Sequence, residues 1–373
     1  MSKYVLVPDS FKGTMTSREI CEIMQHAIER IDSDAKIISV PVADGGEGSV
    51  DAFLSALGGK RKAITVTGPH FEKLSSSYGI TDDGTAVIEM SACAGLPLVY
   101  GKKNPELTTT YGVGELICNA ARSGAKRIVI GLGGSATNDG GCGAVAAAGI
   151  KFYDKSGKSF IPVGRTLKDI ASIDYSGLDS ALSGVSISAM CDVDNPLGET
   201  GAANVFGPQK GANVAMIARL DAGLKHLAEV SGKAKLASMP SAGAAGGMGF
   251  GMMAFFNCPL QMGIDGLLDI IDFESILAGA DLVLTGEGRI DPQSMRGKTV
   301  IGVARRASKC GVPTIAVVGD IADGIESAYD LGVSAIFSIN RVAMERKLIK
   351  LRAKSDMEAT VENIIRAVKA VKL

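Results

Sequence analysis

The stretch IVIGLGGSATNDGGCGAVAAAG, from Ile128 to Gly149, joins a short β-branched run, a cluster of glycines with hydroxyl residues, and a run of alanines. Branched residues favour strands and alanines favour helices, so this order predicts a strand, a loop and a helix. Backbone amides at a helix entrance attract anions. The stretch therefore predicts an α/β fold with an anion-binding loop. It leaves open whether the anion is a dinucleotide, ATP or a smaller substrate.

Both ends of the chain repeat this alternation of strand and helix. Near the N-terminus we expect strands at 4–8 and 36–44, each followed by a helix, the first with Thr16 and Glu19 as a capping box. Near the C-terminus we expect strands at 280–288, 313–319 and 334–339, a helix at 298–311, and a final helix that begins with a second capping box at Ser355 and Glu358. Such alternation is typical of a parallel sheet with crossover helices.

The middle of the chain has a different pattern, with short extended runs and a hairpin predicted around Asp83-Gly84. We therefore expect a discontinuous, doubly wound (Rossmann-like) parallel-sheet domain from residues 1–61 and 270–373. A mixed α/β domain is inserted at 62–269. Ligands of such folds bind at the carboxyl ends of strands and between domains, so the active site is expected in the cleft between the two.

Composition excludes several classes of function. The chain has 39 basic and 40 acidic residues, a formal net charge of −1 and 5% aromatic residues, which argues against a nucleic-acid partner. The start has no apolar signal region, and the uncharged stretch between Lys235 and Asp265 is interrupted by prolines and glycines. We therefore expect a cytoplasmic protein without a membrane partner, and a buried helix within that stretch.

Polar groups follow the first expected strand at Asp9, Ser10 and Lys12. Lys12 could hold a phosphate or a carboxylate, and Asp9 could bind a hydroxyl. The alternative is an ordinary turn with Lys12 in solvent. After the second strand, Asp44 and Glu47 suit magnesium or the hydroxyls of a polyol, but they also have the spacing of acids that stabilise a helix N-terminus.

A third group is MCDVDNPLGE, with Asp192, Asp194 and Asn195. We expect that only one of the two aspartates need enter a site. A carboxylate here could accept a proton from a substrate hydroxyl. The alternative is an Asx-turn ahead of Pro196.

The fourth group lies in LTGEGRIDPQSMRGKT and contains Glu287, Arg289, Asp291 and Lys298. Its end resembles a Walker A loop, but Pro292 stands where that motif requires glycine, so it is not a P-loop. Lys298 could still reach a phosphate at the start of a helix, with simple exposure to solvent as the alternative.

The opening stretch also matches a dinucleotide fingerprint. Gly131, Gly133 and Ala136 follow a strand, and Asp154 ends the next strand 23 residues after Gly131. An NAD(P)-dependent oxidoreductase is therefore an alternative, as is a non-catalytic nucleotide or small-acid sensor. Against the dinucleotide, Asp139 at the helix entrance would repel a pyrophosphate unless magnesium intervenes.

Taken together, these motifs resemble the bacterial class I glycerate kinase family. The resemblance runs from residue 4 to nearly the C-terminus and rests on VPDSFKGTMTS, PVADGGEGSVDA, NPELTTTYGVGELI, IGLGGSATNDGG, CDVDNPLGETGAANVFGPQKGA, GAAGGMGFG and DLVLTGEGRID. It implies a two-domain α/β enzyme that phosphorylates D-glycerate with ATP and Mg²⁺, and it favours 2-phosphoglycerate as the product. It leaves the oligomeric state open between monomer and dimer.

We assign roles within this resemblance as hypotheses. Asp192 is the favoured general base, Lys12 or Arg289 would bind the glycerate carboxylate, and Asp9 a hydroxyl. Magnesium is expected at Asp44, Glu47 and Asp291. Further contacts to glycerate or phosphate are expected from Ser10, Gly133, Gly134, Ser135, Thr137, Asn138, Asp139, Asn195, Glu287 and Lys298.

Overall fold

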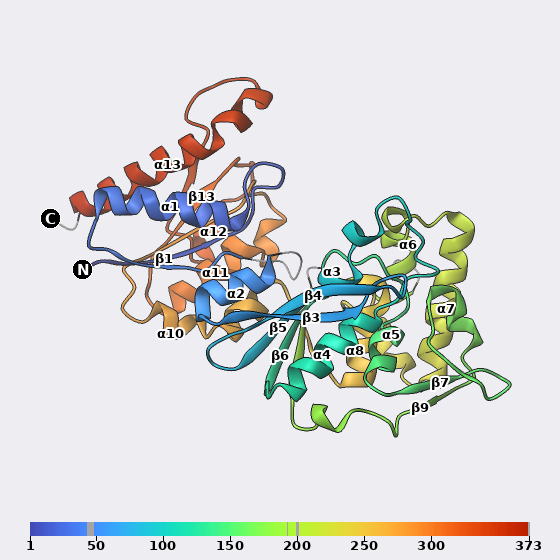
Figure 1. Ribbon diagram of the computed structural model, residues 1–373. Helices are drawn as coiled ribbons and strands as arrows, with labels where there is room; N and C mark the ends of the chain where they lie inside the picture. Colours follow the sequence, from blue (N-terminus) through green and yellow to red (C-terminus); the bar gives the residue numbers. More distant parts are fainter. Residues whose placement is uncertain (43–47, 192, 199–200, 372–373) are drawn as a thin grey trace. The chain divides into compact units, whose positions relative to one another are not determined.

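The computed structural model describes residues 1–42, 48–191, 193–198 and 201–371. Contacts divide the chain into two compact units, one formed by Met1–Ala43 with Gly263–Leu373 and the other by Asp44–Met262 (Figure 1).

These divisions differ from the boundaries expected at residues 61 and 270, and packing explains both differences. Helix α2 (Ser49–Leu57) contacts strands β4 (Lys73–Ile80) and β5 (Thr85–Glu89), so it groups with the second unit. Helix α9 (Gly263–Ile270) packs on α11 (Thr299–Lys309), so it groups with the first.

The first unit contains five described strands in one sheet, in the order β14-β13-β12-β1-β2. Every neighbouring pair is parallel. The strands are β1 (Lys3–Pro8), β2 (Lys36–Ser39), β12 (Leu282–Gly286), β13 (Thr314–Val318) and β14 (Ala335–Ser338). Numbered within this unit alone, the order is 2-1-3-4-5, which occurs in open α/β sheets with helices on both faces.

Alternate residues of β13 show that both faces of this sheet are covered. Ile315 and Val317 share a core with α1 (Ser17–Ile31) and α13 (Arg346–Val371), which pack side by side (Figure 1). Ala316 and Val318 belong to a separate core with α11 and α12 (Ser327–Asp330). The capping box predicted at Thr16 and Glu19 is confirmed at the start of α1.

The second unit contains a mixed sheet whose described strands have the order β11-β10-β6-β5-β4-β3. Its members besides β4 and β5 are β3 (Lys60–Thr67), β6 (Arg127–Gly131), β10 (Ser186–Cys191) and β11 (Leu260–Met262). The pairs β3–β4 and β4–β5 are antiparallel, whereas β5, β6, β10 and β11 run parallel. The mixed α/β class with parallel sheets is therefore as expected.

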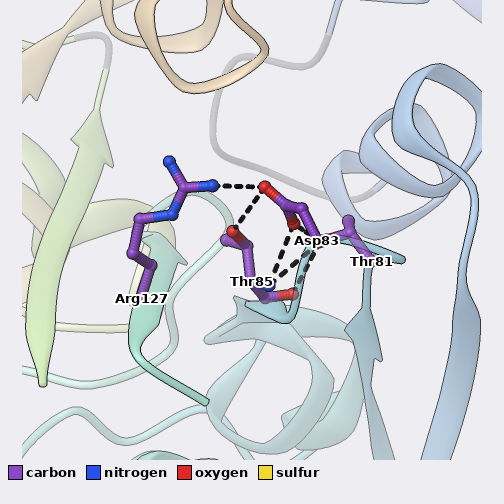
Figure 2. Close-up of polar contacts among 4 residues, drawn as sticks. All are labelled: Thr81, Asp83, Thr85 and Arg127. Carbon is purple, nitrogen blue, oxygen red and sulfur yellow. Dashed lines mark hydrogen bonds and ion pairs between the residues drawn. The ribbon is translucent and has the colours of Figure 1, made fainter.

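The hairpin predicted around Asp83-Gly84 is confirmed between β4 and β5 (Figure 2). Asp83 accepts hydrogen bonds from the Thr81 hydroxyl and from the backbone N–H of Thr85, at 3.0 Å, and it pairs with the guanidinium of Arg127. Thr85 and Arg127 begin β5 and β6. This polar cluster thus secures the amino edge of the parallel strands, opposite the edge from which the glycine-rich loop leaves β6.

Helices α4 (Tyr111–Arg122), α5 (Cys142–Ala147), α7 (Val214–Val230) and α8 (Ala244–Phe256) complete the two cores of this unit, together with a small sheet of order β8-β7-β9. The small sheet comprises β7 (Lys151–Tyr153), β8 (Ser159–Phe160) and β9 (Ser172–Asp174). As predicted, the uncharged stretch forms a buried helix, α8, whose start is kinked at Ala245, Gly246 and Gly247, where φ is positive. Within the described ranges, no helix is both long and apolar enough to cross a membrane.

Candidate active site

The carboxyl edge of the first unit's sheet has a position suited to ligand binding. Strands β1 and β12 are neighbours, but α1 leads from β1 to β2 on one side and α11 leads from β12 to β13 on the other. Open α/β sheets bind ligands at the carboxyl ends of strands where the connections diverge in this way. Asp9 follows β1 and Glu287 follows β12, so both predicted residues lie at this point.

Close backbone packing fixes the two loops that carry these residues. The N–H of Asp9 donates to the carbonyl of Gly286 at 2.8 Å, and the N–H of Ser10 donates to Oδ1 of Asp9 at 2.6 Å. Phe11 is buried against Gly286 and Gly288. These contacts within the protein therefore hold the two loops in place.

Glu287 carries a buried, strongly perturbed carboxyl group on this edge. It is 7% exposed, and its Oε1 has no hydrogen-bond partner among the described residues. Burial raises the pKa of Glu287 to about 7, and the charges of Asp9 and Asp291 act in the same direction, against Ser294 and Lys298. A buried carboxylate with a free oxygen, beside further acids, is well suited to meet a cation or a proton.

The other residues predicted on this edge are more exposed. Lys12 and Lys298 are exposed to solvent. Arg289 is about half exposed, with Nε 3.9 Å from Oδ2 of Asp320. Oδ1 of Asp291 accepts hydrogen bonds from the backbone N–H groups of Gln293, at 2.9 Å, and Ser294, at 3.2 Å, so this carboxylate also secures its own turn.

The second group of predicted residues lies on residues 133–139, called here the 133–139 loop, which leaves the carboxyl end of β6. The loop runs beside helix α3 (Ser91–Ala94): the N–H of Ala136 donates to the carbonyl of Ala94 at 2.8 Å, and the N–H of Leu96 donates to that of Gly134 at 2.9 Å. Gly134 has φ +72°, a left-handed conformation that glycine adopts without strain, which explains a glycine here.

Asp139 is an anchor of this loop. We expected it to contact the ligand, but its buried carboxylate accepts four hydrogen bonds from the protein. Two come from the N–H and hydroxyl of Thr110, at 2.8 and 2.9 Å, and two from the N–H groups of Gly141 and Gly143, at 3.1 and 3.2 Å. Burial raises the pKa of Asp139, and these hydrogen bonds oppose the rise.

Thr137 and Asn138 differ from Asp139 in having unused polar atoms. Both residues are 0% exposed. Oγ1 of Thr137 and both Oδ1 and Nδ2 of Asn138 have no hydrogen-bond partner in the part of the chain that the structure describes. Because buried polar atoms are nearly always hydrogen-bonded in folded proteins, these three atoms call for a polar partner, which is either an ordered water or a bound ligand.

Sequence reasoning missed Lys210. This lysine is 2% exposed, and its Nζ donates to Oγ of Ser135 at 2.8 Å and to the carbonyl of Thr137 at 2.7 Å. Burial lowers the pKa of Lys210 to about 7, and the charge of Asp139 opposes the change. The only sequence signal was its place between glycines in FGPQKGA, which fits an exposed turn equally well.

Three predicted residues lie outside the described residues, namely Asp44, Glu47 and Asp192. Asn195, close to the last of these in sequence, is half-buried, and its carbonyl accepts from the N–H of Gly243 at 2.9 Å. Among the residues that are described, no group of three or more His, Cys, Asp or Glu side chains could hold a metal ion.

The dinucleotide alternative does not fit the fold. Asp154 follows β7, which belongs to the small sheet and not to the sheet that contains β6. Its Oδ1 accepts from the hydroxyl and N–H of Ser156, at 2.6 and 2.8 Å, within a local turn. A dinucleotide fingerprint requires the acid at the end of an adjacent parallel strand, so the spacing was coincidental.

Comparisons with known proteins agree with the resemblance. The profile of the Glycerate kinase family matches residues 4–369. The chain is 44% identical to "Glycerate kinase" of Bacillus subtilis (strain 168), covering 99% of this chain and 98% of the relative. It is 46% identical to "Glycerate 2-kinase" of Escherichia coli (strain K12), covering 90% of each. A crystal structure of the protein designated glycerate kinase 2 from Salmonella typhimurium LT2 superposes with a TM-score of 0.86 at 39% identity, covering 100% of this chain and 99% of the other. The chain belongs to the glycerate kinase family.

Proposed function

We propose that this kinase transfers the terminal phosphoryl group of ATP to the 2-hydroxyl of D-glycerate, with Mg²⁺, giving 2-phosphoglycerate and ADP. Membership of the family supports the reaction, and the Escherichia coli relative, named as a 2-kinase, supports the position. The observation that carries the proposal is the set of unpartnered buried atoms of Thr137 and Asn138. They offer donors and acceptors to a small hydroxy acid.

The first unit supports the same reaction. Its strand order and its helices on both faces favour the doubly wound, Rossmann-like interpretation, with Asp44–Met262 as an inserted domain. Phosphoryl transfer depends mainly on positioning and on neutralising charge. Lys12, Arg289 and Lys298 supply positive groups near the carboxyl edge of this sheet for a phosphate or carboxylate.

Two of the described acids, Asp9 and Glu287, suit a magnesium ion that is also held by substrate phosphates. Mg²⁺ in kinases is usually held by one or two carboxylates together with substrate phosphates, so a protein cage of three acids is not needed. Oε1 of Glu287 is buried without a hydrogen-bond partner among the described residues, and Asp9 is close enough to raise the pKa of Glu287, so these two carboxylates would hold the ion. The chemistry that such an ion supplies is neutralisation of phosphate charge. Asp44, Glu47 and Asp291 stay as sequence-based predictions for the same ion.

Asp192 stays the proposed general base, because a carboxylate after β10 can accept the proton of the attacking hydroxyl. A cytoplasmic location, the lack of a nucleic-acid partner and a monomeric or dimeric state are likewise predictions from composition and resemblance.

The test is turnover with identification of the product. The protein is incubated with D-glycerate, ATP and Mg²⁺, ADP release is followed, and the product is examined by proton-coupled ³¹P NMR. A phosphate on the 2-hydroxyl is attached to a CH carbon and gives a doublet, whereas one on the 3-hydroxyl is attached to a CH₂ carbon and gives a triplet. No ADP release would contradict kinase activity on glycerate, and a triplet would contradict the 2-position. Glycerate binding without turnover would favour the sensor alternative.

A further inference from the structure

Lys210 is a buried lysine in a chain whose described lysines are mostly exposed. It ends the short 3₁₀ segment Pro208–Lys210 and is followed by Gly211 in the left-handed conformation, φ +93°. Moving an ammonium group out of water is costly unless it gains partners. Its described partners are both on the 133–139 loop, 73 and 75 residues away in sequence, so this lysine is directed specifically at that loop.

The contact fixes the direction of the Ser135 hydroxyl. When Lys210 is protonated, its ammonium group only donates, so Oγ of Ser135 accepts from Nζ and the hydroxyl proton points elsewhere. No described residue accepts that proton. Ser135 is 6% exposed, so the proton is directed within a largely buried environment.

The neighbouring charges make this hydroxyl a strong donor. A hydrogen bond received at the oxygen polarises the O–H bond, and the effect is larger at low dielectric. The nearest carboxylate on the loop, Asp139, is already engaged by Thr110, Gly141 and Gly143. Beside Ser135, the unpartnered atoms of Thr137 and Asn138 add further capacity for a polar ligand.

We infer that Lys210 is a positioning residue, which orients the Ser135 hydroxyl to donate to a negatively charged oxygen of the substrate. This rests on the proposed function, because it takes the 133–139 loop as part of the kinase site. The oxygen belongs either to the glycerate carboxylate or to a phosphate of the nucleotide, and binding measurements distinguish the two.

The alternative is that Lys210 only fastens the loop. A fastening role predicts lower thermal stability after removal of the ammonium group, with no dependence on the Ser135 hydroxyl. An orienting role predicts that the two side chains act as one unit in ligand affinity, so that their effects are not additive.

The experiment compares Ser135→Ala, Lys210→Met, Lys210→Arg and the double variant Ser135→Ala/Lys210→Met. Steady-state kinetics give kcat and KM for D-glycerate and for MgATP, and calorimetry gives the affinity for each alone. Circular dichroism and thermal melts check folding. The matched control is the exposed pair in which Nζ of Lys62 donates to Oγ of Ser123, in the same unit, changed to Lys62→Met/Ser123→Ala.

We expect Ser135→Ala to weaken binding of one substrate about 10- to 100-fold, the usual loss for a hydrogen bond to a charged group. Weaker glycerate binding assigns the oxygen to the carboxylate, and weaker MgATP binding assigns it to a phosphate. Lys210→Met should show a similar loss, the double variant no greater loss, and Lys210→Arg a smaller one. The control pair should leave both affinities unchanged.

The inference is overturned if folded Ser135→Ala binds both substrates within twofold of the wild type, or if the two single effects add in the double variant. If Lys210→Met does not fold, Ser135→Ala and Lys210→Arg decide the matter. A wild type that binds and phosphorylates no glycerate would instead reject the proposed function, which is a separate outcome.

Discussion

Glu287 is a buried acid, and its raised pKa determines the sign of its effect on stability. In the unfolded chain a glutamate titrates near its ordinary value of 4.5, whereas in the folded protein Glu287 titrates at about 7. The folded state therefore prefers the protonated form. The destabilising effect of the ionised Glu287 side chain is absent below about pH 4.5, grows between pH 4.5 and pH 7, and is complete above pH 7.

We therefore expect Glu287→Gln to raise the melting temperature at pH 8 and to leave it nearly unchanged at pH 4.5. One pKa unit corresponds to about 1.4 kcal/mol, so the gain at pH 8 is on the order of 3 kcal/mol at most. Thermal melts in EDTA measure it, with Glu326→Gln, an exposed glutamate of the same unit, as the control. An equal shift at both pH values would show that the charge is not the cause.

The second prediction at this scale concerns the general base. Asp192→Asn keeps the size and hydrogen-bonding capacity of the side chain but cannot accept the proton, so kcat should fall by about 10²- to 10⁴-fold. Asp194→Asn is the matched control, because Asp194 is exposed on the same segment. A loss smaller than about tenfold for Asp192→Asn, or an equal loss for Asp194→Asn, would reject the assignment.

At the scale of elements, local sequence signals predicted some features well. The capping box at Thr16 and the hairpin at Asp83 depend on neighbours in sequence, and both were correct. The last helix was predicted to begin at Ser355, but α13 begins at Arg346. Oγ of Ser355 donates to the carbonyl of Arg352 within the helix, at 2.9 Å. The predicted start was wrong because a Ser-x-x-Glu pattern also occurs inside helices.

Helix α8 allows a test of how one element supports the 133–139 loop. At Gly246 φ is +71°, and an added Cβ would lie 2.0 Å from the carbonyl oxygen of Thr137. At Gly184 φ is +74°, but an added Cβ would have no neighbour within 4 Å. Alanine at either position costs about 1 kcal/mol or more of backbone strain, and only Gly246→Ala adds a clash with the loop.

We expect Gly246→Ala to lose more stability than Gly184→Ala, by about 2 kcal/mol or more, because the overlap forces backbone to move. Its kcat/KM should also fall, since Thr137 must shift. Thermal melts and kinetics on both variants measure these effects. Equal losses of stability and of kcat/KM in the two variants would mean that the contact between α8 and the 133–139 loop does not affect stability or activity.

At the scale of the whole molecule, the sequence predicted the alternation of strands and helices but not every long-range pairing. The spacing of Asp154 suggested a strand beside β6, yet β7 pairs within another sheet. Strand pairing depends on tertiary packing, which the residues within one short segment do not determine. Lys210 was missed for the same reason, since its contacts cross more than seventy residues. Asp9 and Glu287, by contrast, were predictable, because parallel strands bring their carboxyl ends to one edge.

This edge leads to a prediction for the complete protein. If Asp9 and Glu287 hold the magnesium that accompanies ATP, the ion relieves the repulsion between these two acids and gives Oε1 of Glu287, which has no hydrogen-bond partner among the described residues, a ligand. ATP with Mg²⁺ should then raise the melting temperature at pH 8 more than ATP with EDTA. Ligand at a hundred times its Kd stabilises the folded state by about 2.7 kcal/mol.

In Glu287→Gln the increment due to magnesium should shrink, because the amide no longer attracts the cation, while the increment due to ATP in EDTA should persist. Melts of both proteins with ATP, in EDTA and in Mg²⁺, separate the two contributions, and Glu326→Gln should respond as the wild type does. A magnesium increment of the same size in Glu287→Gln would place the ion on other acids, with Asp44 and Glu47 the next to be changed. Because this readout does not require turnover, it tests the metal site separately from the choice of general base.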